Sequence, residues 1–186
     1  MDTVTINRAP VLTLWAAVVA ERLGFERDEA LTLGKAVAGL TAQSKGQRLG
    51  IFMPSPDEVR RKRAEKARAA GVFPVALLGR AVPVLQTDDG LRAAGKDQKP
   101  VRPETVEKYL VSKFGEALPA VRRAMEKLAM SRTPEVLAEE GFRLYEAFRP
   151  GIPSGESGWG AKGESSLKKI ERLVETRHQA ARPFAR

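Results

Sequence analysis

Basic side chains gathered in two short segments are the strongest chemical signal in this 186-residue sequence. Segment 45–68 holds eight lysines and arginines against three carboxylates, and segment 162–186 holds seven against three. The resulting charges, +5 and +4, together equal the formal net charge of +9. Concentrated positive charge attracts polyanions, because lysine and arginine bind phosphate oxygens and displace counterions. The two segments therefore predict contact with nucleic acid, an anionic membrane surface or an acidic protein.

The candidate phosphate-binding residues form two groups that are far apart along the chain. We expect them to converge in space as one continuous electropositive face. Such contacts would position a nucleic acid without reading its sequence. The first group is Arg60, Arg61, Arg63, Lys66 and Arg68, and the second is Lys168, Lys169 and Arg172.

Residues 19–33 fit the helix-turn-helix template loosely, with a small residue and a turn glycine four positions apart. The second helix of that motif reads base edges, and here Thr32 and Lys35 are its candidate base contacts. Asp28 and Glu29 open the same helix, where their carboxylates would repel phosphate. An ordinary helical hairpin is therefore favoured over a DNA-reading motif.

The glycine-rich stretch 151–163 invites comparison with a phosphate-binding loop. Gly155 and Gly160 have the right spacing, but Ala161 stands where such a loop requires lysine. We therefore reject nucleotide binding. Trp159 either packs against the fold, which is favoured, or remains available to stack on a base.

Residues suited to metal binding or catalysis are scarce. His178 is the single histidine, and the chain has no cysteine, so neither paired-imidazole nor thiolate metal sites can form. His178 lies at the border of the apolar stripe of the last predicted helix, and we expect it to be a surface residue rather than a member of a catalytic triad. The acidic pairs are adjacent in sequence, as is typical of caps and turns. We expect no metal and no cofactor, and an enzyme is the least favoured class.

The first elements that would position these residues are two helices, over residues 7–23 and 28–45. Apolar residues recur along both at helical spacing, and a glycine turn joins them as a hairpin. Gly34 and Gly39 each weaken the second helix by about 1 kcal/mol relative to alanine. We expect another helix to approach closely at both glycines.

The next helix, residues 55–71, carries the first basic group. Ser55 is the expected cap, followed by a proline at the first helical position. Val59 is the only large apolar residue, so the helix must project into solvent or lie against a charged partner. A solvated helix with pairs such as Glu58 to Lys62 is the simplest interpretation, and a nucleic-acid contact is the next.

The remaining chain divides into a β-rich insert and a second helical section. Short apolar runs over 73–78 and 81–86 predict strands, with Pro74 and Pro83 at sheet edges. From Pro103 onward, apolar residues at helical spacing predict a compact bundle. Its last helix begins near residue 165 and has basic residues opposite its apolar stripe.

The sequence thus predicts a mainly α fold, a helical hairpin plus a helical bundle with a small β-hairpin insert, or alternatively an α+β fold. The predicted units are 1–71, 72–102 and 103–186. The longest apolar run is too short to cross a membrane, and the lack of cysteine suits a cytoplasmic protein.

The prediction of function rests on the charge distribution rather than on a sequence motif. The favoured prediction is a non-enzymatic protein that binds nucleic acid, namely duplex DNA with weak sequence specificity. If five to seven phosphates were neutralised, log affinity should fall against log salt with a slope of about −4 to −6. The alternative is a helical interaction module with an acidic protein partner, and a small enzyme is the third.

Overall fold

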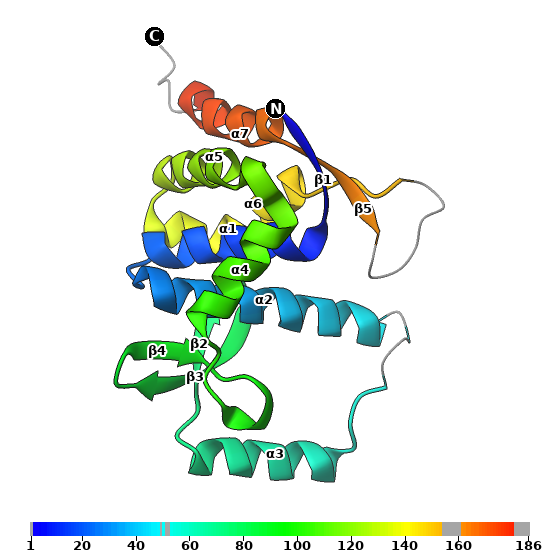
Figure 1. The fold of residues 1–186 in the computed structure, drawn as a ribbon, viewed down its shortest axis with the longest axis vertical. Coiled ribbons are helices and arrows are strands. Elements are labelled where there is room, and N and C mark those ends of the chain that lie inside the picture. The colour runs from blue at the N-terminus through cyan, green and yellow to red at the C-terminus, as the bar shows by residue number, and fades with distance from the viewer. Residues whose placement is uncertain (1, 49, 51–52, 154–160, 181–186) are drawn as a thin grey trace.

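Helix α1 (Arg8–Arg22) lies at the centre of the fold in the computed structural model, which describes residues 2–48, 50, 53–153 and 161–180 (Figure 1). Every residue of α1 from Pro10 to Ala20 is buried. The Trp15 indole Nε1 donates a hydrogen bond to the Gly141 carbonyl at 2.8 Å. Its ring meets the Phe148 ring edge-on, with centroids 5.4 Å apart. The centre of the protein is therefore a helix buried on all sides.

Helix α2 (Arg27–Arg48) forms the predicted hairpin with α1, after a turn at Gly24 with φ of 111°. A Cβ atom on Gly34 would lie 2.4 Å from the Thr13 carbonyl oxygen and 2.9 Å from the Ala17 backbone nitrogen. The close approach of a second helix at Gly34 is therefore confirmed. At Gly39 the expectation is wrong, because a Cβ there would meet nothing within 4 Å.

The predicted helical section is confirmed, and its helices enclose α1 together with α2. Helices α4 and α6 cross α1, while α7 packs on α5. Short 3₁₀ segments join some of the elements. The helices are α4 (Pro103–Phe114), α5 (Leu118–Met130), α6 (Pro134–Phe148) and α7 (Leu167–Ala180). The 3₁₀ segment η1 (Lys96–Gln98) precedes α4, and η2 (Gly115–Ala117) joins α4 to α5.

An antiparallel ribbon of β1 (Thr3–Asn7) and β5 (Lys162–Ser166) was not predicted. We expected residues 162–166 to be loop and the start of the last helix. The sequence of β5 lacks alternating apolar residues, so it carries no strand signal. Gly163 pairs with Ile6, and a Cβ on Gly163 would overlap the Gly151 backbone.

The predicted β-rich insert is a three-stranded antiparallel sheet in the order β2-β3-β4. Pro74 lies on edge strand β2 as expected, but the prediction for Pro83 is wrong because β3 is central. The Pro83 carbonyl accepts a hydrogen bond from the Ala94 N–H at 2.8 Å, so the Pro83 nitrogen also points toward the end of β4. The missing N–H of this proline therefore interrupts no hydrogen bond between β2 and β3. The strands are β2 (Phe73–Leu77), β3 (Arg80–Thr87) and β4 (Gly90–Ala93).

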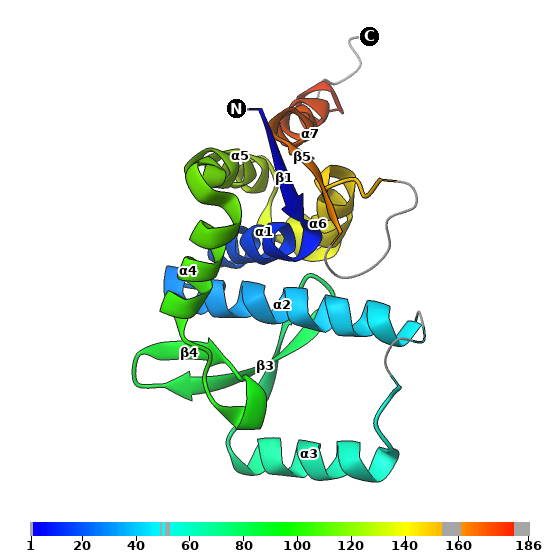
Figure 2. The same ribbon diagram turned by 45° about the vertical axis from the view of Figure 1, so that its right-hand side comes forward.

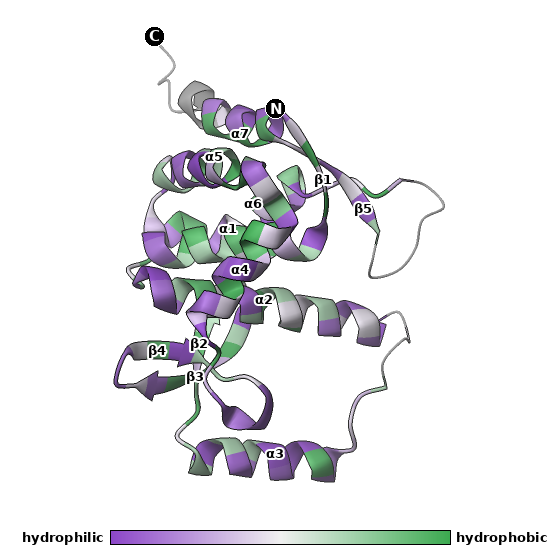
Figure 3. Cartoon of the chain, viewed as in Figure 1, coloured by the Kyte–Doolittle hydropathy of each residue, from purple (hydrophilic) through white to green (hydrophobic). Residues whose placement is uncertain are grey.

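The buried apolar side chains form one cluster that extends from Ile6 to Ile170 and draws on all three predicted units. Helix α3 (Asp57–Ala69) contributes no buried residue to it, and Figure 3 shows this helix as mostly hydrophilic. The fold is mainly α with small β elements, as predicted. None of the described helices combines the length and apolar character that a membrane span needs.

Substitution of Gly34 tests the close contact between α1 and α2. Gly34→Ala should lower the free energy of unfolding by about 1–3 kcal/mol, because the new methyl group would overlap backbone atoms of α1. Gly39→Ala is the matched control in the same helix. It should raise the stability by about 0.5–1 kcal/mol through helix propensity alone. Urea denaturation measures both, and equal effects of the two variants would contradict the contact.

Candidate nucleic-acid interface

Helix α3 begins one residue later than predicted. Ser55 does not cap it; Pro56 occupies the cap position with φ of −53° and ψ of 149°. The Ser55 hydroxyl instead accepts a hydrogen bond from Arg63 at 3.4 Å. Extended backbone at Pro56 moves Ser55 beyond reach of the first free N–H groups of the helix.

The predicted isolation of α3 is confirmed. All its residues are exposed except Ala67, which is half-buried. The ion pair between Glu58 and Lys62 is present at 3.7 Å, as expected for residues four apart on a solvated helix. Exposure of the whole helix leaves its charged side chains available to a partner.

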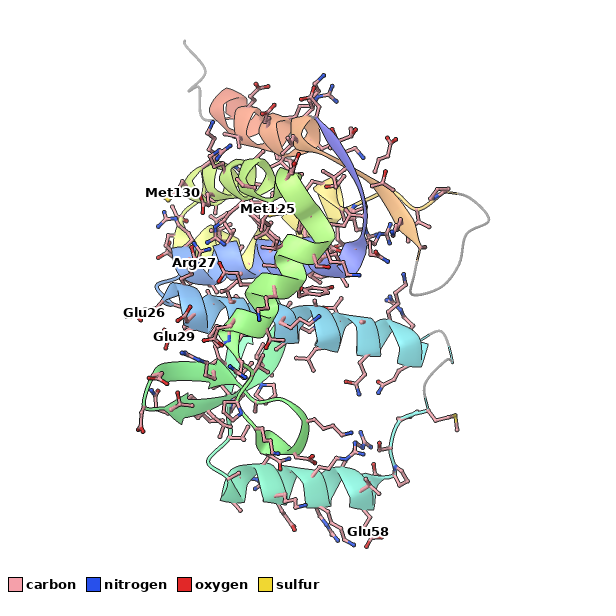
Figure 4. The ribbon with its side chains drawn as sticks, viewed as in Figure 1. Glu26, Arg27, Glu29, Glu58, Met125 and Met130 are labelled. Carbon is pink, nitrogen blue, oxygen red and sulfur yellow. The ribbon has the colours of Figure 1, made fainter. Side chains whose placement is uncertain are left out.

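The half-buried residue Ala67 marks the inner side of α3, which faces the rest of the protein. Glu58 precedes Ala67 by nine residues and so lies on the opposite side of the helix, at about 100° per residue. Figure 4 shows Glu58 pointing away from the rest of the protein. We call the side that carries Glu58 and Glu65 the outer side of α3.

The first basic group divides between these sides. Arg60, close to the inner side, forms an ion pair with Asp57, and Arg63 donates to Ser55. The other three side chains are exposed and make neither ion pair nor hydrogen bond with any part of the chain that the structure describes. These available cations are Arg61, Lys66 and Arg68.

The second basic group lies on α7, opposite its apolar stripe, as predicted. Ile170 is buried, whereas Lys168, Lys169 and Arg172 are exposed. Lys168 forms an ion pair with Asp2 at 3.3 Å. The apolar stripe of α7 holds the helix against α5, and the cations face outward.

The two groups do not form the expected continuous face. Helices α3 and α7 lie at opposite ends of the long axis of the protein in both views (Figures 1 and 2). Helices α1, α2 and α5 lie between them. The expectation of convergence is therefore wrong, because α7 is bound to the core by its stripe while α3 lies beyond the sheet.

Thr32 cannot act as the base contact that we expected. It is fully buried; its hydroxyl accepts the Ala93 N–H at 3.0 Å and donates to the Glu29 carbonyl at 3.0 Å. Strand β4 thus covers the face of α2 that a helix-turn-helix motif would present to bases. The prediction for Thr32 is wrong, and the interpretation of an ordinary hairpin is confirmed.

Glu29 has a structural role that the sequence did not indicate. Its carboxylate accepts the Glu26 N–H at 3.0 Å and the Leu91 N–H at 2.8 Å. The first bond satisfies a free amide at the start of α2, and the second ties β4 to the same helix. The contact between α2 and β4 therefore rests on Glu29 and Thr32 together.

Lys35, the other expected base contact on α2, lies over an aromatic ring. Its Nζ is 3.6 Å from the centroid of Tyr109 on α4, an attractive cation–π geometry. Burial, together with the nearby charge of Lys113, lowers the pKa of Lys35. Trp159, the third candidate base contact, lies outside the described residues.

Burial shifts the pKa of both tyrosines upward. Tyr145 is buried, its hydroxyl donates to the Arg8 carbonyl at 3.4 Å, and burial raises its pKa to about 12. Burial also raises the pKa of Tyr109. Within the described ranges, the acidic and imidazole side chains do not gather into groups of three or more that could hold a metal ion.

Two lysines near α3 were not among the predicted phosphate contacts. Lys96 and Lys99 are exposed in the loop around η1, which lies beside α3 in both views. Asp97 and Gln98 between them have φ of 58° and 57°, a left-handed conformation that is costly without glycine. The Gly95 N–H closes the loop on the Lys99 carbonyl at 2.7 Å.

Comparison with known proteins adds no relative: no family model, curated protein or solved structure matches this chain.

Removal of the Thr32 hydroxyl tests its structural role. Thr32→Val should cost about 1–3 kcal/mol of unfolding free energy, because the buried Ala93 N–H loses its acceptor. Thr41→Val is the control, since the Thr41 hydroxyl only donates to a helix carbonyl; we expect a change within about 0.5 kcal/mol. Thermal unfolding measures both. Weaker DNA binding by folded Thr32→Val protein would contradict the buried role.

Proposed function

We propose that this protein binds nucleic acid without catalysing a reaction, and that its ligand is duplex DNA held by phosphate contacts along α3. The observation that carries the proposal is the exposure of every residue of α3 except Ala67, with Arg61, Lys66 and Arg68 free of protein partners in the described part of the chain. The loop that holds Lys96 and Lys99 lies beside the same helix in both views and adds positive charge to this end of the protein.

An acidic protein is the alternative partner. Protein interfaces have a buried core enriched in aromatic and apolar side chains. Helix α3 offers only Val59, which is 39% exposed, as a large apolar residue. Charge without an apolar centre favours a polyphosphate over a folded protein.

We also propose that the protein acts in the cytoplasm, because a chain without cysteine forms no disulfides and needs no oxidising compartment.

The separation of the two basic groups changes the expected salt dependence. With α3 alone in contact, about three to five phosphates would be neutralised, which gives a slope of about −3 to −4.5 for log affinity against log salt. Contact by both groups at once would give a steeper slope. Phosphate contacts by themselves carry no sequence information.

Neutralisation of the free cations on α3 tests the proposal. The triple variant Arg61→Gln, Lys66→Gln, Arg68→Gln should bind a random-sequence duplex more weakly at low salt. Its slope should become shallower by about 2 to 3, at about 0.9 per lost phosphate contact. Fluorescence anisotropy at several salt concentrations measures both quantities.

The matched control is the triple variant Lys168→Gln, Lys169→Gln, Arg172→Gln, which loses the same charge from α7. Its slope should equal that of the unmodified protein. Equal losses in both triple variants would show a contact that depends on net charge only. A protein that binds no duplex at the lowest salt but binds polyglutamate would support the acidic-protein alternative instead.

A further inference from the structure

The outer side of α3 has an ordered charge pattern. Residues seven apart on a helix lie only about 20° apart around its axis, so Glu58 and Glu65 form one acidic row. Basic side chains flank this row on both sides, within about 100° of it at 100° per residue. The flanking residues are Arg61 and Arg68 on one side and Lys62 and Lys66 on the other.

The width of α3 and the arrangement of its charges fit a DNA major groove. The groove is about 12 Å wide, and a helix with its side chains is about 10–12 Å across. A helix in the groove has a phosphate strand on each side and base edges in front. Cations on both flanks would therefore face the two strands. A helix lying along a single strand would need cations on one side only.

The position of α3 leaves this side open. The helix lies at one end of the protein in both views, and its outer side faces away from the other described elements (Figures 1, 2 and 4). At 13 residues, the helix is about 20 Å long. A duplex could therefore approach α3 along its whole length.

We propose, as an extension of the proposed function, that α3 enters the major groove and that Glu58 and Glu65 face the base edges. A carboxylate accepts hydrogen bonds from the cytosine N4 amino group. Glu65 is the more available of the two, because Glu58 has an ion pair with Lys62. The protein would therefore prefer duplexes with cytosine at the positions that these carboxylates meet.

The two carboxylates also allow a direct test, because groove insertion and flat binding predict opposite effects of their neutralisation on DNA affinity. In the groove, each carboxylate contributes a contact to a matching base pair, so its neutralisation weakens binding to the preferred sequence. On a helix that lies flat against phosphates, each carboxylate is repelled by the ligand. Its neutralisation would then strengthen binding to every sequence alike.

The experiment starts with selection of preferred sequences from a randomised duplex pool by the full chain. Glu65→Gln should then bind the selected duplex about 5- to 100-fold more weakly, with little change for duplexes in which the contacted C·G pair is replaced. Glu58→Gln is the second variant. Glu139→Gln, an exposed charge-matched change on α6, is the control and should leave all affinities unchanged.

The outcomes separate this inference from the proposed function. Selection without any enriched sequence, or a uniform gain of affinity in Glu65→Gln and Glu58→Gln, would overturn groove insertion while leaving phosphate binding intact. No binding of any duplex would overturn both. Loss of discrimination at one base pair in Glu65→Gln would support the inference.

Discussion

Helix α1 is buried along its length from Pro10 to Ala20, and this burial constrains every other element. A helix that is apolar on all sides needs partners all around, and α2, α4, α5 and α6 supply them. The backbone contact at Gly34 brings α2 close enough to complete this enclosure. A helix with one large apolar residue cannot join such a shell, so α3 lies outside it. The isolation of α3 thus follows from the demands of the core.

The same packing decides which surface can meet a ligand. Glu29 and Thr32 hold β4 against α2, so the face of α2 that could have read DNA is used inside the protein. The stripe of α7 that includes Ile170 binds it to the opposite end of the fold. A polyanion is thus offered two separate basic surfaces. Among the described residues, three cations of the first basic group on α3 and two of the second on α7 lack a carboxylate partner.

Local pattern predicted much of the fold. Helical spacing located the hairpin and the bundle, apolar runs located β2 and β3, and the absence of apolar residues marked α3 as exposed. The β1–β5 ribbon was missed because it joins segments far apart in sequence, and β5 has no alternating pattern. The burial of Thr32 and the separation of α3 from α7 were missed for a related reason. Both depend on which elements pack together, which residue spacing along one helix does not reveal.

We propose that α3 alone binds duplex DNA. The most direct measurement is a ¹H–¹⁵N NMR titration of the full chain with a short random-sequence duplex at low salt. We expect shifts concentrated in residues 57–69 and in the neighbouring loop at Lys96–Lys99, with the amides of α7 unchanged. Shifts confined to α7, or no shifts at all, would contradict it.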